Sequence, residues 1–371
     1  MRMFALLANP ARVSAMSNNV VKWGVVGCGD VCEIKSLPAI AKHPDCQVVS
    51  LCRRNQIELK AFRDRHDGLQ DAKLFSEYRD VIEYLKELKD AGSKVCLYVA
   101  TPVSMHSPIC LSALDAGINC YCEKPLARDY NECRQLVDKV NSSDEDVRLW
   151  VAYYRRRLPK FQVVESNLRR LGVITSVSVK LLQKRHLMPA EEKAHWHFDK
   201  ATSGGGLIMD LGSHIFDLLD HLLGTISNCS GVSVRACDTS PGGKDGIEDV
   251  VVGSWSHDMD RDGRQYKLPG VCEFNFAAGV NLDEVTITGT EGLIKFVTFS
   301  DDLPVFCSVG GEEEELEFES AGGVLEHVHA PLLEDVVKDL IQGTRDCPST
   351  GESAARCNLV LDKLLGRDEW K

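Results

Sequence analysis

Short apolar segments alternate with helix-like segments through the first 155 residues, and no other feature constrains the fold more. Two parallel strands need a crossover of about a dozen residues or more, usually a helix, so this alternation predicts a doubly wound parallel sheet. The expected strands are residues 22–26, 47–52, 95–100, 119–122 and 147–152. The expected helices are residues 31–42, 57–65, 78–89, 108–116 and 130–140.

The pattern changes after residue 155, where the apolar segments lengthen and follow one another through simple loops. This spacing predicts a mostly antiparallel sheet with a few helices. The expected strands there are residues 174–182, 250–256, 271–276, 285–290 and 293–299. We therefore expect an α/β protein with a doubly wound domain at residues 20–154 and an α+β domain with a large open sheet at residues 155–371.

The composition excludes several classes of partner. The chain has 371 residues, enough for two domains, and a formal net charge of −12 without a long Lys/Arg-rich patch. Nucleic acid and anionic membranes are therefore not expected as partners. No run of about 18 apolar residues predicts a membrane span. The 15 cysteines, an odd number scattered through apolar segments, favour reduced thiols in a cytoplasmic protein.

The N-terminal residues 1–19 lie ahead of the first expected strand. Their first part contains Arg2 and Arg12 but no acidic residue, and its apolar piece is too short for a secretory signal. We expect a disordered extension there, and the alternative is a mitochondrial-type presequence.

The sequence GVVGCGDVCE, residues 24–33, joins the first expected strand to the first expected helix. Gly27 permits a tight turn, and Gly29 lets the backbone approach a pyrophosphate without a Cβ in the way. The helix N-terminus, at Asp30 and Val31, then supplies free N–H groups and a partial positive charge. The segment predicts a dinucleotide-binding turn, and the alternative is a plain strand–helix turn.

The second expected strand ends in Leu51-Cys52-Arg53-Arg54. A sheet that binds NAD usually carries an acid near this end for the ribose 2′-hydroxyl, whereas an arginine suits a 2′-phosphate. A guanidinium binds phosphate through its planar fork and stacks on adenine. Arg53 and Arg54 therefore favour NADP over NAD, and the alternative is two solvated loop arginines.

Polar residues also follow two later strands of the predicted sheet. Open α/β sheets bind ligands at the carboxyl ends of their strands. An ammonium group at such an end can reach both the nicotinamide ribose and a substrate oxygen. The residues expected to line the cofactor site here are Thr101, Pro102, His106, Glu123 and Lys124.

Residues 203–224, SGGGLIMDLGSHIFDLLDHLLG, contain three glycines followed by a helical pattern. At about 3.6 residues per turn, Asp210, His214, Asp217 and His221 fall within an arc of about 60°, beside an apolar stripe. A carboxylate one turn before an imidazole can fix its tautomer, and histidine suits proton transfer near neutral pH. The stripe predicts a catalytic Asp210–His214 pair, and the alternative is an i,i+4 pair on a solvated helix face.

Three residue pairs could each present two metal ligands on one face of a strand. None is followed by a partner pair at zinc-finger spacing, so no required metal is expected. The pairs are His195 with His197, His327 with His329, and Cys120 with Cys122.

Together these stretches resemble the Gfo/Idh/MocA oxidoreductase family, which includes glucose–fructose oxidoreductase and inositol dehydrogenase. The resemblance covers most of the chain from about residue 20 onward, and it is most specific at Glu123-Lys124-Pro125. The other matching residues are Gly24, Gly27, Gly29, Ala100, Thr101, Pro102, His106, Leu126, Ala127, residues 153–157, residues 204–206, Asp210, Gly212, His214 and Asp217.

The resemblance implies an N-terminal Rossmann domain and a C-terminal domain that binds substrate and often mediates oligomers through its open sheet. It implies that Lys124 contacts both cofactor and substrate, and that Asp210 and His214 serve in catalysis. It further implies that Arg157 and Trp196 line the substrate pocket.

Two positions depart from the family pattern. Cys32 stands at the small third position of the glycine turn, and Arg53-Arg54 replaces the common acid, which disfavours NAD.

The expected function is hydride transfer between a nicotinamide cofactor, NADP rather than NAD, and a carbonyl or alcohol of a sugar, polyol or related small molecule. The alternatives are a non-catalytic NADP-binding redox sensor or regulator on the same fold, and a metal-dependent dehydrogenase. The resemblance makes a homodimer or homotetramer the expected assembly.

Overall fold

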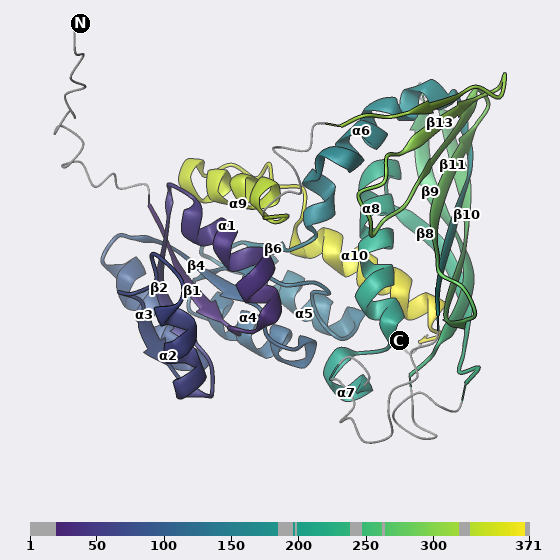
Figure 1. Cartoon of the computed structure of the whole chain (residues 1–371). Coiled ribbons are helices and arrows are strands. Elements are labelled where there is room, and N and C mark those ends of the chain that lie inside the picture. The colour runs from purple at the N-terminus through teal and green to yellow at the C-terminus, as the bar shows by residue number, and fades with distance from the viewer. Residues whose placement is uncertain are drawn as a thin grey trace, which may run out of the picture.

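The computed structural model describes residues 20–184, 196, 199–237, 247–261, 264–318 and 327–367. Two β-sheets, one from each half of the chain, stand on either side of a layer of helices (Figure 1). Within these ranges, no helix combines the length and the apolar character that crossing a bilayer requires.

The first sheet confirms the predicted parallel topology, with strand order β3-β2-β1-β4-β5-β6. The order reverses between β1 and β4, so the carboxyl ends of these strands flank the point where such sheets bind ligands. The sequence pattern does not predict β3, an edge strand with no buried residue. The strands are β1 (Val21–Val26), β2 (Cys46–Cys52), β3 (Lys73–Phe75), β4 (Lys94–Val99), β5 (Asn119–Cys122) and β6 (Leu149–Val151).

Helices connect these strands as predicted. The first begins after the glycine turn with the π-helical segment η1 (Cys32–Ser36) and continues as α1 (Leu37–Lys42). Asn55 caps the next helix, since its side-chain oxygen accepts two backbone N–H groups of the first turn. The remaining helical segments of this half are α2 (Gln56–Asp64), α3 (Tyr78–Asp90), η2 (Val103–Met105), α4 (His106–Asp115) and α5 (Tyr130–Asn141).

The second sheet confirms the expected open, mostly antiparallel architecture. Its order is β14-β13-β12-β11-β7-β10-β9-β8, and only β7 and β10 pair in parallel. The pattern misses β8, β13 and β14, which lack a continuous buried apolar run. The strands are β7 (Ile174–Lys184), β8 (Ile226–Val234), β9 (Val250–Arg261), β10 (Arg264–Ala278), β11 (Leu282–Gly289), β12 (Gly292–Phe296), β13 (Val305–Ser308) and β14 (Glu313–Glu315).

The last two helices tie the two halves together. α10 (Gly351–Leu364) lies between the sheets, against α5 on one side and β8 on the other (Figure 1). α9 (Ala330–Gln342) returns to the first sheet and lies beside α1 (Figure 1). The other helical segments are η3 (Tyr154–Arg157), α6 (Pro159–Asn167), η4 (Leu168–Leu171), α7 (Lys200–Ser203), η6 (Ile208–Gly212) and α8 (Ser213–Leu223).

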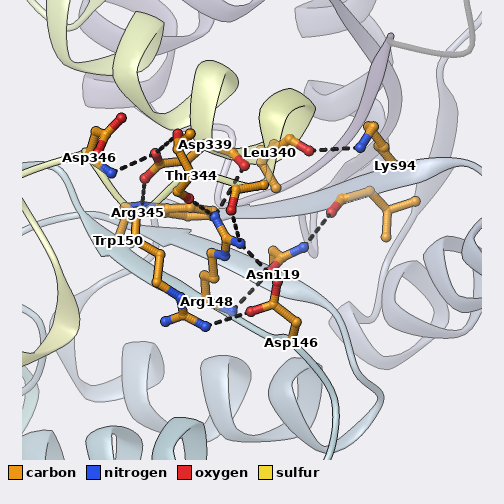
Figure 2. Close-up of polar contacts among 12 residues, drawn as sticks. Lys94, Asn119, Asp146, Arg148, Trp150, Asp339, Leu340, Thr344, Arg345 and Asp346 are labelled. Atoms are coloured by element: carbon orange, nitrogen blue, oxygen red, sulfur yellow. Dashed lines mark hydrogen bonds and ion pairs between the residues drawn. The ribbon is translucent and has the colours of Figure 1, made fainter.

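A buried Arg148–Asp339 network holds the C-terminal end of α9 against β6 (Figure 2). The Arg148 guanidinium donates to the carbonyls of Asp339 and Gly343, each at 3.1 Å, so a cation caps the negative end of the helix. The Asp339 carboxylate accepts from Trp150 Nε1 at 3.3 Å and from Thr344 Oγ1 at 2.7 Å (Figure 2). The N-terminal end of α9 is thereby fixed over the carboxyl edge of the first sheet.

Candidate active site

The glycine turn leaves open space at the start of the first helix. Gly27 has a φ of +99°, and a Cβ there would lie 2.4 Å from the carbonyl oxygen of Ala100, so the turn requires glycine. A Cβ on Gly29 would meet no protein atom within 4 Å. The helix starts at the exposed residues Asp30 and Val31, and the N–H groups of a first helical turn have no partner within the helix. This space fits a pyrophosphate.

The third position of the turn accommodates Cys32 as a buried side chain. A hydrogen bond with the Cys28 thiol and burial together raise the pKa of Cys32 well above its ordinary value. The thiol therefore stays protonated and packs as a small apolar group.

Both arginines of the second strand lie next to this turn, since Val26 at the end of β1 pairs with Cys52 at the end of β2. Arg53 Nη1 donates to the carbonyl of Cys28 at 3.2 Å, and its guanidinium forms an ion pair with Glu58. Arg54 is exposed. The structure thus places both residues where the sequence predicts them, with Arg53 already engaged by the protein.

The loop after β4 is held by a buried histidine. His106 Nε2 lies 2.8 Å from the Thr101 carbonyl, and its Nδ1 lies 2.9 Å from the Pro125 carbonyl. His106 therefore connects the Thr101-Pro102 loop to the segment that follows β5. The hydroxyl of Thr101 is buried without a hydrogen-bond partner.

Glu123 points beneath the strand ends rather than into solvent. Its Oε1 accepts a hydrogen bond from the hydroxyl of Tyr98 at 2.6 Å, and that hydroxyl lies 2.5 Å from Ser36 Oγ. Burial raises the pKa of Tyr98 well above its ordinary value, so the phenol remains a neutral donor to the carboxylate.

Lys124 joins the two halves of the chain at the site. Its Nζ donates to the main-chain carbonyl of Asp210 at 3.1 Å and forms an ion pair with the Asp210 carboxylate. The Lys124–Pro125 peptide bond is cis. A lysine at the end of β5 and a carboxylate ahead of α8 therefore meet. This contact differs from the pairing of Asp210 with His214 that the sequence predicts.

His214 lies in the same region and is 5% exposed. Its ring stands edge-on to Tyr154 at a centroid distance of 5.7 Å and to Phe299 at 6.1 Å, and its Nδ1 has no hydrogen-bond partner. Burial lowers the pKa of His214 well below its ordinary value, and the charges of Arg155 and Lys124 lower it further. His214 is therefore a neutral imidazole that can accept a proton.

The expected Asp210–His214 hydrogen bond is replaced by other contacts. Asp210 lies in η6, where a π-helical turn shifts it out of α-helical register with His214. Its carboxylate pairs with Lys124, and Asp217 forms two hydrogen bonds with Arg156, at 2.7 and 2.8 Å. A single four-residue stripe is therefore the wrong description of this helix.

The three arginines of η3 point to three different places, because successive side chains of a 3₁₀ helix are about 120° apart. Arg157, expected to line the substrate pocket, pairs with Asp335 on α9 at 2.5 Å. Arg155 instead enters the region of His214. Its Nη1 donates to the Tyr154 hydroxyl at 3.1 Å, and its Nε donates to the Thr298 carbonyl at 3.3 Å.

Trp196, the other residue expected in the substrate pocket, is half-buried ahead of α7, and its carbonyl accepts from Asp199 N at 3.1 Å. Its contact with substrate stays a prediction.

Sequence reasoning missed a second imidazole at this site. His329, next to the start of α9, is 1% exposed, and its ring stacks on Tyr154 at a centroid distance of 4.7 Å. Its Nδ1 lies 3.3 Å from the hydroxyl of Tyr121, and its Nε2 lies 3.8 Å from Glu123 Oε1 without a hydrogen bond. The available signal was the His-x-His spacing at residue 327, which suggested a metal pair.

Among the residues that the structure describes, no group of three or more His, Cys, Asp or Glu side chains is arranged to hold a metal ion. His195 and His197 fall outside the described residues. His327 lies in a turn rather than a strand, with its Nε2 2.9 Å from Lys42 Nζ and away from His329.

Comparison with known proteins matches both halves of the chain. The model described as "Oxidoreductase family, NAD-binding Rossmann fold" matches residues 21–153, and the model described as "GFO/IDH/MocA C-terminal domain" matches residues 164–295. Oxidoreductase P35 of Formosa agariphila is 28% identical over 93% of this chain and 98% of its own length. The 1,5-anhydro-D-fructose reductase of Ensifer adhaerens is 26% identical over 73% of this chain and 74% of its own length.

Among solved structures, levoglucosan dehydrogenase in complex with NADH and L-sorbose shares the fold, with a TM-score of 0.76 and 21% identity over 93% of this chain and 95% of that one. The matches to both halves show that this chain belongs to the GFO/IDH/MocA family and is an NAD(P)-dependent oxidoreductase.

Proposed function

We propose that the protein interconverts a secondary alcohol and a ketone, or an alcohol and an aldehyde, on a sugar or polyol. The observation that carries this proposal is the convergence of Lys124, Asp210 and His214 from the two halves of the chain. The names of the relatives agree with it, since they include a reductase of 1,5-anhydro-D-fructose and a dehydrogenase of levoglucosan.

The residues present fit a nicotinamide dinucleotide. The open space above Gly29 suits a pyrophosphate, and the unpartnered Thr101 hydroxyl at the end of β4 offers a hydrogen bond to the cofactor. Lys124 would contact the nicotinamide ribose. When bound, a nicotinamide would supply the hydride acceptor for alcohol oxidation and the hydride donor for carbonyl reduction.

The side chains of this chain then manage the proton and the charge on the reacting oxygen. During oxidation, neutral His214 accepts the hydroxyl proton as the carbonyl forms, and during reduction the protonated imidazole returns it. Lys124 donates a hydrogen bond to the oxygen as negative charge develops, while Asp210 holds the ammonium in place.

Two substitutions test these roles. His214→Ala and Lys124→Met should each lower turnover about 10²–10⁴-fold, the usual contribution of a proton-transfer group. His214 lies outside the glycine turn, so the NADPH affinity of His214→Ala, measured from cofactor fluorescence, should change little. Wild-type turnover is found with a panel of sugars and polyols by following absorbance at 340 nm. Cofactor binding without oxidation of any panel member would favour the redox-sensor alternative.

We further propose that NADP is the preferred cofactor, because the end of β2 carries Arg53 and Arg54 where an acid would serve NAD. Titration should give a lower dissociation constant for NADPH than for NADH. Arg54→Ala should raise the dissociation constant for NADPH by a larger factor than the dissociation constant for NADH. Tighter binding of NADH by the wild type would contradict the assignment.

A further inference from the structure

The Arg155 guanidinium lies in the active-site region, where no described carboxylate serves as its counter-ion. The side chain is 9% exposed, and it pairs with no carboxylate in the part of the chain that the structure describes. Its neighbours Arg156 and Arg157, on the same 3₁₀ turn, both have aspartate partners. A buried charge without a partner is costly to a folded protein, so its retention here calls for a ligand or a functional reason.

The contacts that Arg155 does make orient it and leave donors free. Nε and Nη1 each donate one hydrogen bond, to the Thr298 carbonyl and to the Tyr154 hydroxyl. A guanidinium has five N–H groups, so three remain for a ligand. The cation also lies over the ring of Phe299 at 4.7 Å and the ring of Tyr154 at 5.0 Å, and both rings attract it.

Arg155 and the catalytic His214 share these aromatic neighbours. His214 stands edge-on to Tyr154 and Phe299, the two rings that Arg155 covers. His329 stacks on Tyr154 as well, and its Nε2 is a buried polar atom without a hydrogen-bond partner. Three polar groups from three separate segments thus gather around one tyrosine, each with hydrogen-bonding capacity that the protein does not use.

The charges around this group are predominantly positive. Lys35, Lys124 and Arg155 all lower the pKa of His214 and of His329, so all three cations lie near both imidazoles. Among the nearby carboxylates, Asp210 is held by Lys124 and Glu123 accepts from Tyr98. An anionic ligand would match this arrangement.

We propose that the substrate is an anionic sugar or polyol, with a carboxylate or phosphate group bound by Arg155, while His214 acts on a hydroxyl or carbonyl of the same molecule. This inference rests on the proposed function, and it narrows the substrate class of that site. His329 Nε2 is then placed to hydrogen-bond a further hydroxyl of the ligand.

The binding experiment needs no turnover. The shift in unfolding midpoint of the wild-type protein, with NADPH present, is compared for glucose, glucuronate and glucose 6-phosphate, and for the galactose and mannose series. At least one anionic member should raise the midpoint more than its neutral parent, and Arg155→Gln should remove most of that difference. The carboxylate and phosphate arms show which anion the site takes.

A matched control is Arg170→Gln. Arg170 lies over the ring of Phe306 at 4.0 Å, as Arg155 lies over Phe299, but it pairs with Glu314 and is partly exposed. This variant should keep the wild-type preference for the anionic ligand. Equal midpoint shifts for neutral and anionic members in the wild type, or an unchanged preference in Arg155→Gln, would overturn the inference.

The kinetic experiment separates this inference from the proposed function. For a series that is turned over, the ratio of kcat/KM for the anionic member to that for the neutral member should exceed about 10 and fall about tenfold or more in Arg155→Gln, as expected for loss of a charge-assisted hydrogen bond. Turnover of neutral members with no anion preference would contradict this inference and still support the oxidoreductase function. Arg155-dependent anion binding without turnover of any series would support the anion site and contradict the proposed oxidoreductase function. Rescue by Arg155→Lys distinguishes loss of charge from loss of packing.

Discussion

At the scale of single residues, the protonation state of His214 sets the pH range of the proposed reaction. Burial, then Arg155 and Lys124, lower the pKa of His214 well below 6.5. Alcohol oxidation requires the neutral imidazole, so kcat/KM should stay level as the pH falls through 6.5 and decline only below it. Removal of one cation raises the imidazole pKa, so Arg155→Gln should move this acidic limb upward.

The measurement is a kcat/KM profile between about pH 4.5 and 8 for both proteins. A wild-type limb at or above the ordinary histidine pKa, near 6.5, would contradict the electrostatic account.

The same lowered pKa of His214 has a consequence for the stability of the fold. The unfolded chain takes up a proton at His214 near pH 6.5 and the folded chain does not, so this residue contributes a stability that is complete above pH 6.5 and declines below it.

Some residues of the candidate site could be proposed from the sequence and others could not. Lys124 and Asp210 could be proposed from the sequence because each belongs to a compact motif at a strand or helix end, and their catalytic roles stay predictions. Arg155 was not distinguishable from Arg157, because adjacent arginines diverge by about 120° only once a 3₁₀ turn is known. His329 was out of reach, since nothing in its local sequence says that it returns to a sheet built from residues far earlier in the chain.

At the scale of elements, periodicity predicted the long helices and buried strands and failed where the geometry departs from it. The pattern of the first helix and of the segment leading into α8 assumes α-helical spacing, whereas η1 and η6 are π-helical. The π-helical segment η6 brings Asp210 to Lys124, and the π-helical segment η1 follows the glycine turn. Both departures from α-helical geometry therefore lie at the candidate site. The strands that the pattern missed are β3, β8, β13 and β14, whose residues are half-buried, alternating or exposed.

Helix α9, the last but one in the chain, explains why the site cannot be read from two independent domains. Its apolar face lies in the same buried cluster as Trp23 and Tyr98 of the first sheet, and Arg148 and Asp339 anchor its far end (Figure 2). Asp335 on its exposed side receives Arg157 from η3. The helix therefore positions His329 at its N-cap and holds η3 through Arg157.

At the scale of the whole molecule, the described helices cover one face of the second sheet and leave the other face open. α8 and α10 pack against its inner side, whereas Val232 of β8 and its cross-strand neighbour Val252 of β9 are 67% and 51% exposed. Val271 of β10, 55% exposed, continues the surface one strand further. Neighbouring exposed valines on a sheet are typical of surfaces that bind another protein.

We expect this face to form a homodimer, or one of the interfaces of a homotetramer, and a buried charge should break it. Sedimentation velocity at micromolar concentrations should give a mass of two or four chains for the wild type and a single chain for Val252→Asp, because an unpaired carboxylate is poorly tolerated in an apolar interface. Val309→Asp is the matched control, since Val309 is 73% exposed in the turn between β13 and β14, away from these valines. That variant should keep the wild-type mass. A wild type that sediments as one chain, or a Val252→Asp protein that retains the full assembly, would show that the open valine face is not the interface.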